Sequence, residues 1–309
     1  MIAFVCLAFG AAIAPRLAPY DPGHQFAGYP FAPPMRPHVV DASGAWHAPF
    51  AYPITLVDPI EGRYSEDRSR RIGWHSSDPW FLLGSDDLGR DVLSRVLAGA
   101  RLSLGVSLLS AILALLIGAA IGAFAGYAGG PIETWLMRVA DVVIVLPIIY
   151  VVLALRGVLP VNLSAAQVFA ALVGVFALVG WPSVARGVRG IVATERHAEY
   201  AEAARALGAS RWRVITRHLL PATRGFMGVQ ATLLVPAFIM AEATLSFAGL
   251  GFLPPTASWG AMLQATASVQ TAADTPWLLA PAAAIVATVF VIHSVAGYPA
   301  ALSGSRHVT

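Results

Sequence analysis

Residues 102–132 read LSLGVSLLSAILALLIGAAIGAFAGYAGGPI and contain no charged side chain. An uncharged apolar run of this length exceeds the roughly 20 residues that an α-helix needs to cross a bilayer. A second uncharged run lies between Arg156 and Arg186, and a third lies between Asp274 and Arg306. These runs predict membrane-spanning helices and therefore decide the fold class.

The composition of the whole chain agrees with a membrane protein. Hydrophobic residues make up 57% of the 309 residues and charged residues only 12%, with a mean hydropathy of +0.68. Soluble domains carry about 25% charged residues. The basic residues are all Arg and lie between the apolar runs rather than along one stripe, so we expect no nucleic acid partner. The single cysteine, Cys6, excludes an internal disulfide, and the sequence has no Cys/His spacing typical of a metal site.

Two further apolar segments carry one acidic residue each, Asp141 within residues 139–155 and Glu242 within residues 225–246. We therefore expect an all-α integral membrane protein with about six transmembrane helices. One is an N-terminal segment, and the others lie near residues 102–125, 134–155, 165–185, 226–246 and 279–302.

The N-terminal apolar segment has two interpretations. Residues 2–14, IAFVCLAFGAAIA, are shorter than a full span. We expect a first transmembrane segment over residues 1–18 with a truncated beginning, because no basic residue precedes the apolar run. The alternative is a secretory signal peptide, since residues 12–14 have the small-x-small form of a cleavage site. Both interpretations place residue 20 outside the cytoplasm.

Residues 19–100 form a long polar segment rich in proline, aromatic residues and mixed charge. We expect this segment to be extracytoplasmic. Its aromatic residues favour a folded or packed structure, because disordered segments contain few of them, and the alternative is a flexible linker. These aromatic residues include Phe26, Tyr29, Phe31, Trp46, Phe50 and Tyr52.

Residues 101–305 form the predicted transmembrane domain, and the loop of residues 186–224 within it sets the orientation. This loop carries many more Arg than acidic residues, so the positive-inside rule places it in the cytoplasm. Arg90, Arg95 and Arg101 lie at the opposite end of the second span. The rule is weak for a segment as long as residues 19–100, so these arginines do not change the orientation.

The same loop predicts two short helices joined by a turn. Residues 195–207 are rich in Ala, Glu and Arg, which are strong helix formers. Gly208 stands where a left-handed C-terminal cap belongs, and Ser210 can cap a second helix. Pro221 prevents that second helix from continuing unbroken.

A resemblance to a known family lies in this loop. The stretch EYAEAARALGAS at residues 199–210, followed by RHLLP at residues 217–221, resembles the EAA loop of ABC importer permeases. The resemblance implies a coupling helix that seats in a separate ATPase subunit, with small alanine side chains that can enter a groove. The matching residues are Glu199, Glu202, Ala203, Ala204, Gly208, Ser210, His218, Leu220 and Pro221.

Four more stretches resemble the dipeptide, oligopeptide and nickel group of these permeases, in order along the chain. They are LGSDDLGRDVLSR at 83–95, GARLSL at 99–104, LMRVAD at 136–141, and AEATLSFAGLGFLPP at 241–255 with SWG at 258–260. The pattern resembles the C-type subunit and implies the type I importer permease fold. It also implies a homologous B-type permease, two ABC ATPase subunits, an extracytoplasmic binding protein and membrane lipid as partners, in the inner membrane of a bacterium.

Motifs for hydrolytic chemistry are absent from the sequence. It contains no GxxxxGK[ST] phosphate loop, no HExxH and no GxSxG. We therefore expect that the chain binds no cofactor and that partner subunits use the ATP to drive alternating access. The solute is open among dipeptides, oligopeptides, nickel complexes and other small molecules, because selectivity rests largely on the binding protein.

Two other classes of protein are alternatives. One is an intramembrane enzyme that uses Asp141, Glu242 or His293, and the other is a secondary transporter, which requires an inverted repeat that we do not find. Acids in a membrane are costly unless they are paired or hydrated, so Asp141 and Glu242 are candidates for the pathway or for polar contacts between helices. Arg138 lies one turn before Asp141 and is the expected ion-pair partner.

Glycines recur every fourth residue over 118–126 and share one helix face. Small residues at this spacing let membrane helices approach closely. The repeat predicts helix packing inside the subunit or, alternatively, a seam with a partner permease.

Overall fold

The computed structural model describes residues 9–41, 44–58, 62–73, 78–158 and 163–303. These residues form two compact units, one of residues 9–103 and 246–287 and the other of residues 104–245 and 288–303. Three long helices contribute to both units. They are α2 (Val92–Ala128), α9 (Arg224–Phe247) and α12 (Ala280–Ser303).

Four helical stretches among the described residues are long and apolar enough to cross a bilayer. They are α2, α5 (Ala165–Glu195), α9, and Pro276–Ser294, which contains η4 (Pro276–Leu279) and part of α12. A fifth span results if α3 (Gly130–Val145) and α4 (Ile148–Val158) are counted as one bent span. The helices confirm the all-α membrane fold.

The expected first span over residues 1–18 falls partly outside the described residues. Residues 9–13 are helical, and η1 (Ala14–Leu17) follows them. Residues 1–8 lie outside the described part of the chain. The choice between a transmembrane segment and a signal peptide therefore stays a prediction.

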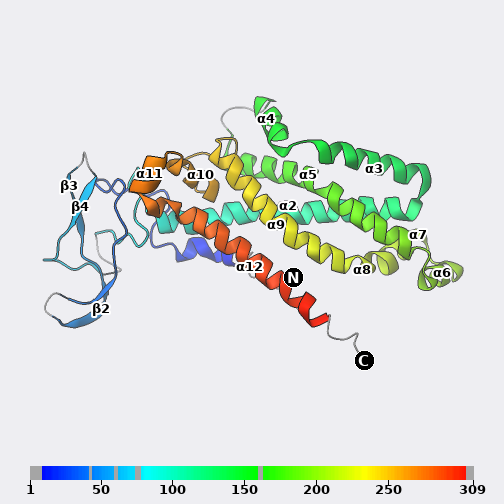
Figure 1. The fold of residues 1–309 in the computed structure, drawn as a ribbon, viewed down its shortest axis with the longest axis horizontal. Helices are drawn as coiled ribbons and strands as arrows, with labels where there is room; N and C mark the ends of the chain where they lie inside the picture. Colours follow the sequence, from blue (N-terminus) through cyan, green and yellow to red (C-terminus); the bar gives the residue numbers. More distant parts are fainter. Residues whose placement is uncertain (1–8, 42–43, 59–61, 74–77, 159–162, 304–309) are drawn as a thin grey trace. The chain divides into compact units, whose positions relative to one another are not determined.

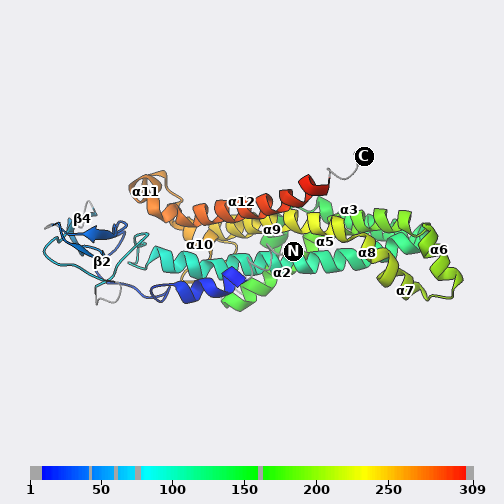
Figure 2. The same ribbon diagram turned by 90° about the horizontal axis from the view of Figure 1, so that it is seen from below.

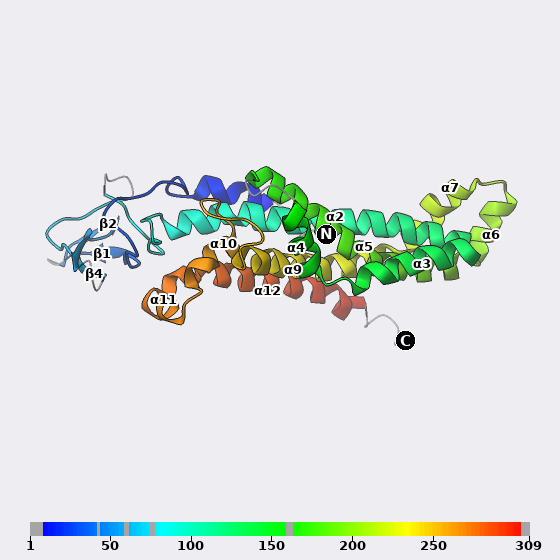
Figure 3. The ribbon, with the colours of Figure 1, turned by 90° about the horizontal axis from the view of Figure 1, so that it is seen from above.

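The helix expected over residues 134–155 is broken in its middle (Figure 3). α3 and α4 meet at an angle of 83° across Leu146 and Pro147. Leu146 has the extended backbone that residues before proline prefer, with a ψ of 114°. Pro147 has no N–H to continue the hydrogen bonds of α3. The prediction of one continuous helix over residues 134–155 was therefore wrong.

α2 and α5 extend beyond their apolar runs. α2 begins at Val92, because the carboxylate of Asp91 accepts hydrogen bonds from the backbone N–H and the hydroxyl of Ser94 in its first turn. α5 begins at a capping box with Ser164 and continues through the first part of the expected loop to Glu195. The apolar pattern locates the part of a helix that lies in lipid, and capping residues set where the helix ends.

Close packing between α2 and α5 explains the glycine repeat over residues 118–126. A Cβ atom at Gly118 would lie 2.5 Å from the Cβ of Val184, and one at Gly122 would overlap the carbonyl oxygen of Ala185. Only glycine lets the two backbones approach this far. The structure thus shows packing inside the subunit for this helix face.

Residues 19–100 contain two antiparallel hairpins that the sequence did not predict (Figure 1). β1 (His38–Val40) pairs with β2 (Trp46–Phe50), and β3 (Ile54–Asp58) pairs with β4 (Arg63–Glu66). A buried cluster accompanies them and favours a folded segment over a flexible linker. It consists of Ala32, Met35, Ala51, Ile54, Ile72, Trp80 and Phe81.

The segment after α9 forms short helices that are fixed to the start of α2. They are α10 (Trp259–Leu263), η3 (Gln264–Thr266) and α11 (Val269–Asp274), followed by η4. The backbone N–H of Trp259 donates to Ser103 Oγ at 3.1 Å, and its indole Nε1 donates to the Val96 carbonyl at 3.0 Å. These bonds give the SWG motif at residues 258–260 a structural role.

Candidate functional site

The chain between α5 and α9, residues 196–223, folds into short helical segments, and we call it the α5–α9 loop. The segments are α6 (Glu199–Ala206), α7 (Arg211–Val214), the π-helical η2 (Ile215–Leu219) and α8 (Leu220–Ala222). Figure 2 shows α6 and α7 at the C-terminal ends of α2 and α5. The pair α6 and α7 corresponds to the predicted helix–turn–helix, although the first helix begins at Glu199 rather than at residue 195.

Gly208 ends α6 in the left-handed conformation that the sequence predicted, with a φ of 82°. Its N–H donates to the carbonyl of Arg205, and the next N–H, of Ala209, donates to the carbonyl of Ala204, both at 3.0 Å. These two bonds form a Schellman cap. The cap fixes the direction in which the chain leaves α6.

Ser210 and Pro221 shape the second helix. Ser210 Oγ accepts a hydrogen bond from the N–H of Arg213 at 3.4 Å and caps α7. Pro221 does not end the helix but follows a widened π-turn, in which the N–H of Leu220 donates to the carbonyl of Ile215. The wider turn accommodates a residue that has no N–H of its own.

One face of the α5–α9 loop packs on α2 and α5. Ala201 and Val214 are buried in one apolar cluster with Ala123 of α2 and Val188 of α5. Ala204 is partly buried against the same cluster, because residues three apart on a helix share a face. Ala204 is thus turned partly toward α2 and α5, and its expected contact with a partner protein stays a prediction. Leu220 also packs on this cluster.

The exposed side of the loop carries three apolar residues among charged ones. Ala203 is exposed in α6, Leu207 after it is 89% exposed, and Trp212 in α7 is 74% exposed. We call these three residues the docking face. Glu199 is exposed at the first turn of α6. Large apolar side chains in water are typical of a surface that binds another protein.

Polar residues of the loop make local contacts. The Tyr200 hydroxyl donates to Glu195 Oε2 at 2.5 Å, and this hydrogen bond raises the pKa of Tyr200 to about 12. The ring of His218 lies 6.4 Å from the ring of Tyr200. Glu202 pairs with Arg205 at 3.7 Å on the surface, which adds little stability.

Asp141 forms its ion pair across helices rather than within one. Its carboxylate in α3 pairs with Arg186 of α5, so the expected pair with Arg138 was wrong. Glu133 of α3 likewise pairs with Arg189 of α5. The two helices pack side by side. The cationic partner of Asp141 therefore comes from α5 instead of from the preceding turn of α3.

Glu242 and His293, the other two ionisable candidates, lie in different surroundings. Glu242 is fully buried in α9. His293 Nδ1 lies 2.9 Å from the carbonyl oxygen of Val289, one turn earlier on α12. This contact favours a hydrogen-bonded histidine over a proton carrier.

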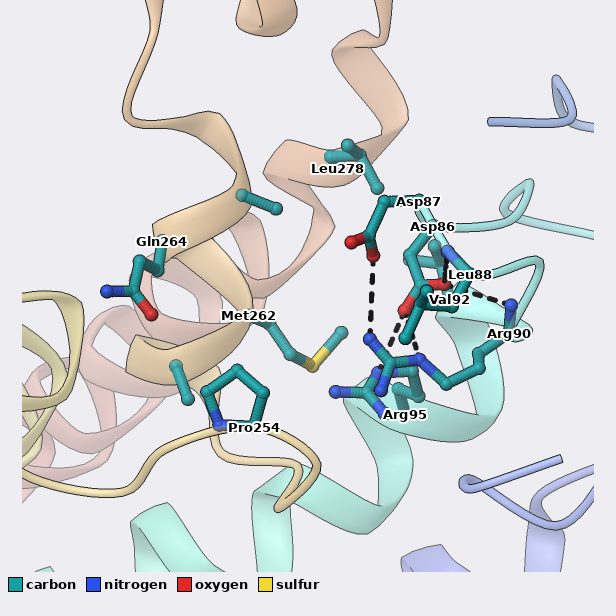
Figure 4. Close-up of a pocket in the computed structure, with 12 residues that line it drawn as sticks. Asp86, Asp87, Leu88, Arg90, Val92, Arg95, Pro254, Met262, Gln264 and Leu278 are labelled. Atoms are coloured by element: carbon teal, nitrogen blue, oxygen red, sulfur yellow. Dashed lines mark hydrogen bonds and ion pairs between the residues drawn. The ribbon is translucent and has the colours of Figure 1, made fainter. Parts of the chain in front are cut away.

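The motif at residues 83–95 folds into a turn with a buried ion-pair network (Figure 4). The carboxylate of Asp86 pairs with Arg90 Nε at 2.7 Å and with Arg95 Nε at 3.4 Å. It also accepts the backbone N–H of Leu88 at 3.0 Å and that of Arg90 at 2.9 Å. Such a fully engaged carboxylate fixes the shape of the turn.

Two glycines and a serine complete this turn. Gly84 and Gly89 have φ values of 73° and 72°. A Cβ atom at Gly84 would lie 2.7 Å from the carbonyl oxygen of Ala32. A Cβ atom at Gly89 would overlap the carbonyl oxygen of Phe26. Ser85 Oγ accepts the N–H of Ala32 at 2.7 Å. The motif therefore packs residues 26–32 closely against the start of α2.

A cavity of about 240 Å³ lies beside the turn, between Asp87 and Arg95 on one side and Met262 and Pro254 on the other (Figure 4). Its acidic and basic groups are joined to one another, with Arg90 Nη2 3.5 Å from Asp87 Oδ1. Within the described ranges, no three His, Cys, Asp or Glu side chains gather as metal ligands would. We assign no chemistry to this cavity.

Long apolar helices and an exposed helical loop at their ends define a multi-pass membrane protein. Comparison with protein families identifies which one. Residues 118–298 match the family described as the binding-protein-dependent transport system inner membrane component, and the chain belongs to this family.

Curated relatives agree with the family. The chain is 40% identical over 216 residues to the dipeptide transport system permease protein DppC of Bacillus subtilis (strain 168), covering 69% of this chain and 65% of that relative. It is 39% identical over 241 residues to the oligopeptide permease OppC of the same organism, covering 77% and 76%. The glutathione permease GsiD of Pectobacterium atrosepticum is 33% identical over 232 residues, covering 74% of each. The chain is a permease subunit of an ABC importer.

Proposed function

We propose that this chain is the C-type permease of an importer for short peptides in the bacterial inner membrane. The similar relatives carry the names of dipeptide, oligopeptide and glutathione permeases. These solutes share a peptide backbone with charged ends. The observation that carries the coupling mechanism is the two-faced α5–α9 loop.

In the proposed mechanism, the docking face seats in a groove of a separate ATPase subunit. Ala203 lets α6 approach the groove floor, and Leu207 and Trp212 lose their contact with water on docking. The opposite face of the loop is packed on α2 and α5. Closure of the ATPases on ATP therefore moves the loop together with these helices, which supplies the movement for alternating access.

The remaining partners follow from the same proposal. The pathway forms between this subunit and a homologous B-type permease, and an extracytoplasmic binding protein delivers the peptide. ATP binds to the partner ATPases, and this chain binds no cofactor. The ion pair of Asp141 and the backbone contact of His293 do not favour the alternative of an intramembrane enzyme.

Transport by the reconstituted complex tests the proposed function. The complete importer in proteoliposomes should take up a radiolabelled dipeptide when ATP is present on the ATPase side. A nonhydrolysable ATP analogue should support no uptake. Uptake driven by a proton or sodium gradient without ATP would show that the chain works as a secondary transporter.

Site-directed labelling tests the proposed orientation. In a Cys6→Ser background, Ser65→Cys and Ser210→Cys each place one thiol at an exposed position. An impermeant maleimide added to spheroplasts should label the first variant and not the second. Labelling of Ser210→Cys from outside would contradict a cytoplasmic α5–α9 loop.

A further inference from the structure

Arg196 stands at the junction of α5, α6 and α2. It is the C-terminal capping residue of α5, at the start of the α5–α9 loop. Its Nη1 donates to the carbonyl oxygen of Gly126 at 3.1 Å and to that of Tyr127 at 3.3 Å. Both carbonyls belong to the last turn of α2, which ends at Ala128.

The end of α2 suits a guanidinium group. The last carbonyls of a helix have no partner within the helix and carry the negative end of its dipole. A planar guanidinium can donate to two such oxygens at once, whereas an ammonium group offers a point charge. Gly129, with a φ of 70°, leaves space for the guanidinium group, since a Cβ atom at Gly129 would lie 2.8 Å from Arg196 Nη1.

The backbone of Arg196 makes the second half of the connection. Its carbonyl oxygen accepts a hydrogen bond from Arg205 Nη2 of α6 at 2.8 Å. Arg196 thus holds α2 with its side chain and α6 with its carbonyl. These three hydrogen bonds give Arg196 a structural role at the end of α2.

We propose that Arg196 is the positioning residue that joins α6 to α2, so that a displacement of α6 by an ATPase moves α2 with it. The inference rests on the proposed function of the α5–α9 loop. The apolar cluster beneath the loop holds α6 in place but is not directional, so its side chains can slide past one another. Hydrogen bonds depend on angle, and the two-arginine connection fixes the orientation of α6 on the end of α2.

Import per ATP hydrolysed, measured on the complete complex in proteoliposomes, tests the proposal. Arg196→Gln should keep the ATPases bound but lower the peptide imported per ATP roughly tenfold, the usual worth of a charge-assisted hydrogen bond in an equilibrium. Arg196→Lys should recover part of the loss, because an ammonium group can reach one carbonyl. Arg224→Gln removes the same charge from an exposed side chain and should match the wild type.

A distance measurement separates coupling from mere folding. Spin labels at Ala128→Cys and Ala206→Cys, in a Cys6→Ser background, report on the ends of α2 and α6. The distance between them should stay constant when ATP binds to the wild-type complex and should change with ATP in Arg196→Gln. A distance that stays constant in Arg196→Gln would overturn the proposal.

Two other results of the transport test would also decide whether Arg196 couples α6 to α2. A wild-type ratio of import to hydrolysis in Arg196→Gln would overturn the proposal, and so would loss of ATPase binding, which would mean that Arg196 only shapes the docking face. Ala203→Asp separates this inference from the proposed function. If Ala203→Asp retains the ATPases, the proposed function fails, whatever Arg196 does.

Discussion

The carboxylate of Asp141 in α3 pairs with the guanidinium group of Arg186 in α5, although Arg138 lies one turn from Asp141 on its own helix. The Asp141 side chain is 55% exposed and that of Arg186 is 46% exposed in the subunit, so the pair is only partly covered by the subunit's own residues. It joins two neighbouring helices, and Asp141 pairs across them rather than with Arg138 of its own helix.

A double-mutant cycle of Asp141→Asn and Arg186→Gln should therefore give a coupling energy of about 0.5–1 kcal/mol in favour of the pair, as for other partly exposed ion pairs. The measurement is unfolding of the purified subunit in mixed micelles, and the coupling should weaken at high salt. The matched cycle of Asp141→Asn with Arg138→Gln should be additive. Coupling to Arg138 instead of Arg186 would contradict the observed pairing.

The contact of α2 with α5 predicts that replacing glycine by alanine changes the stability of the subunit differently at two positions. Gly122→Ala places a Cβ against the backbone of Ala185 and should destabilise the subunit by about 1–3 kcal/mol, as overpacking does. Gly174→Ala in α5 meets no atom within 4 Å. It should be neutral or stabilising by up to about 1 kcal/mol, because alanine is the better helix former. Equal effects at the two positions would argue against the close packing.

The cap at Gly208 predicts a conformational cost without a steric one. No atom lies within 4 Å of a Cβ built at Gly208, but its φ of 82° is unfavourable for a β-branched residue. Gly208→Val should loosen the end of α6 by about 1–2 kcal/mol, whereas Gly208→Asn should cost less, since asparagine tolerates this conformation. Hydrogen exchange of the α6 amides measures both. Identical protection in the two variants would mean that the left-handed turn does not matter.

Most of the membrane helices could be predicted from the apolar runs. α9 and α12 lie within two residues of the ranges expected from sequence, because a helix in lipid must be apolar along its embedded length. The break at Pro147 could not be predicted in this way. Pro182 and Pro236 lie inside unbroken helices, so a proline alone does not decide whether neighbouring groups compensate for its missing hydrogen bond.

The residues of the candidate site also differ in how far the sequence predicts them. Gly208 and Ser210 act on the backbone next to them, so their capping roles could be predicted from local sequence. The inward position of Ala204 and the contacts of Arg196 depend on how α6 packs against helices far away in the sequence. Leu207 was part of the quoted motif, and only the structure showed how exposed it is.

Tyr200 should titrate well above an ordinary tyrosine. Its hydrogen bond to the Glu195 carboxylate raises the pKa from 10.0 to about 12, so the folded loop favours the neutral phenol. The stabilisation is fully present below pH 10 and is lost as the pH rises through 12. The tyrosinate absorbance of the wild type minus that of Tyr200→Phe should show this group. In a Glu195→Gln background, the same difference should titrate nearer pH 10.

A titration near pH 10 with Glu195 in place would contradict the hydrogen bond. Tyr200 is 42% exposed, so the effect on global stability is expected to be small. The useful readout is therefore the titration of the phenol itself, not the unfolding of the subunit.

The central claim is that the docking face of the α5–α9 loop binds an ATPase subunit, and capture of the ATPases by the purified permease complex tests it most directly. Ala203→Asp places a charge on the surface to be desolvated, so we predict that the ATPases dissociate while the membrane helices stay folded. The control Ala222→Asp adds the same charge at another exposed alanine of the loop and should retain the ATPases. Wild-type capture of the ATPases by Ala203→Asp would contradict the claim.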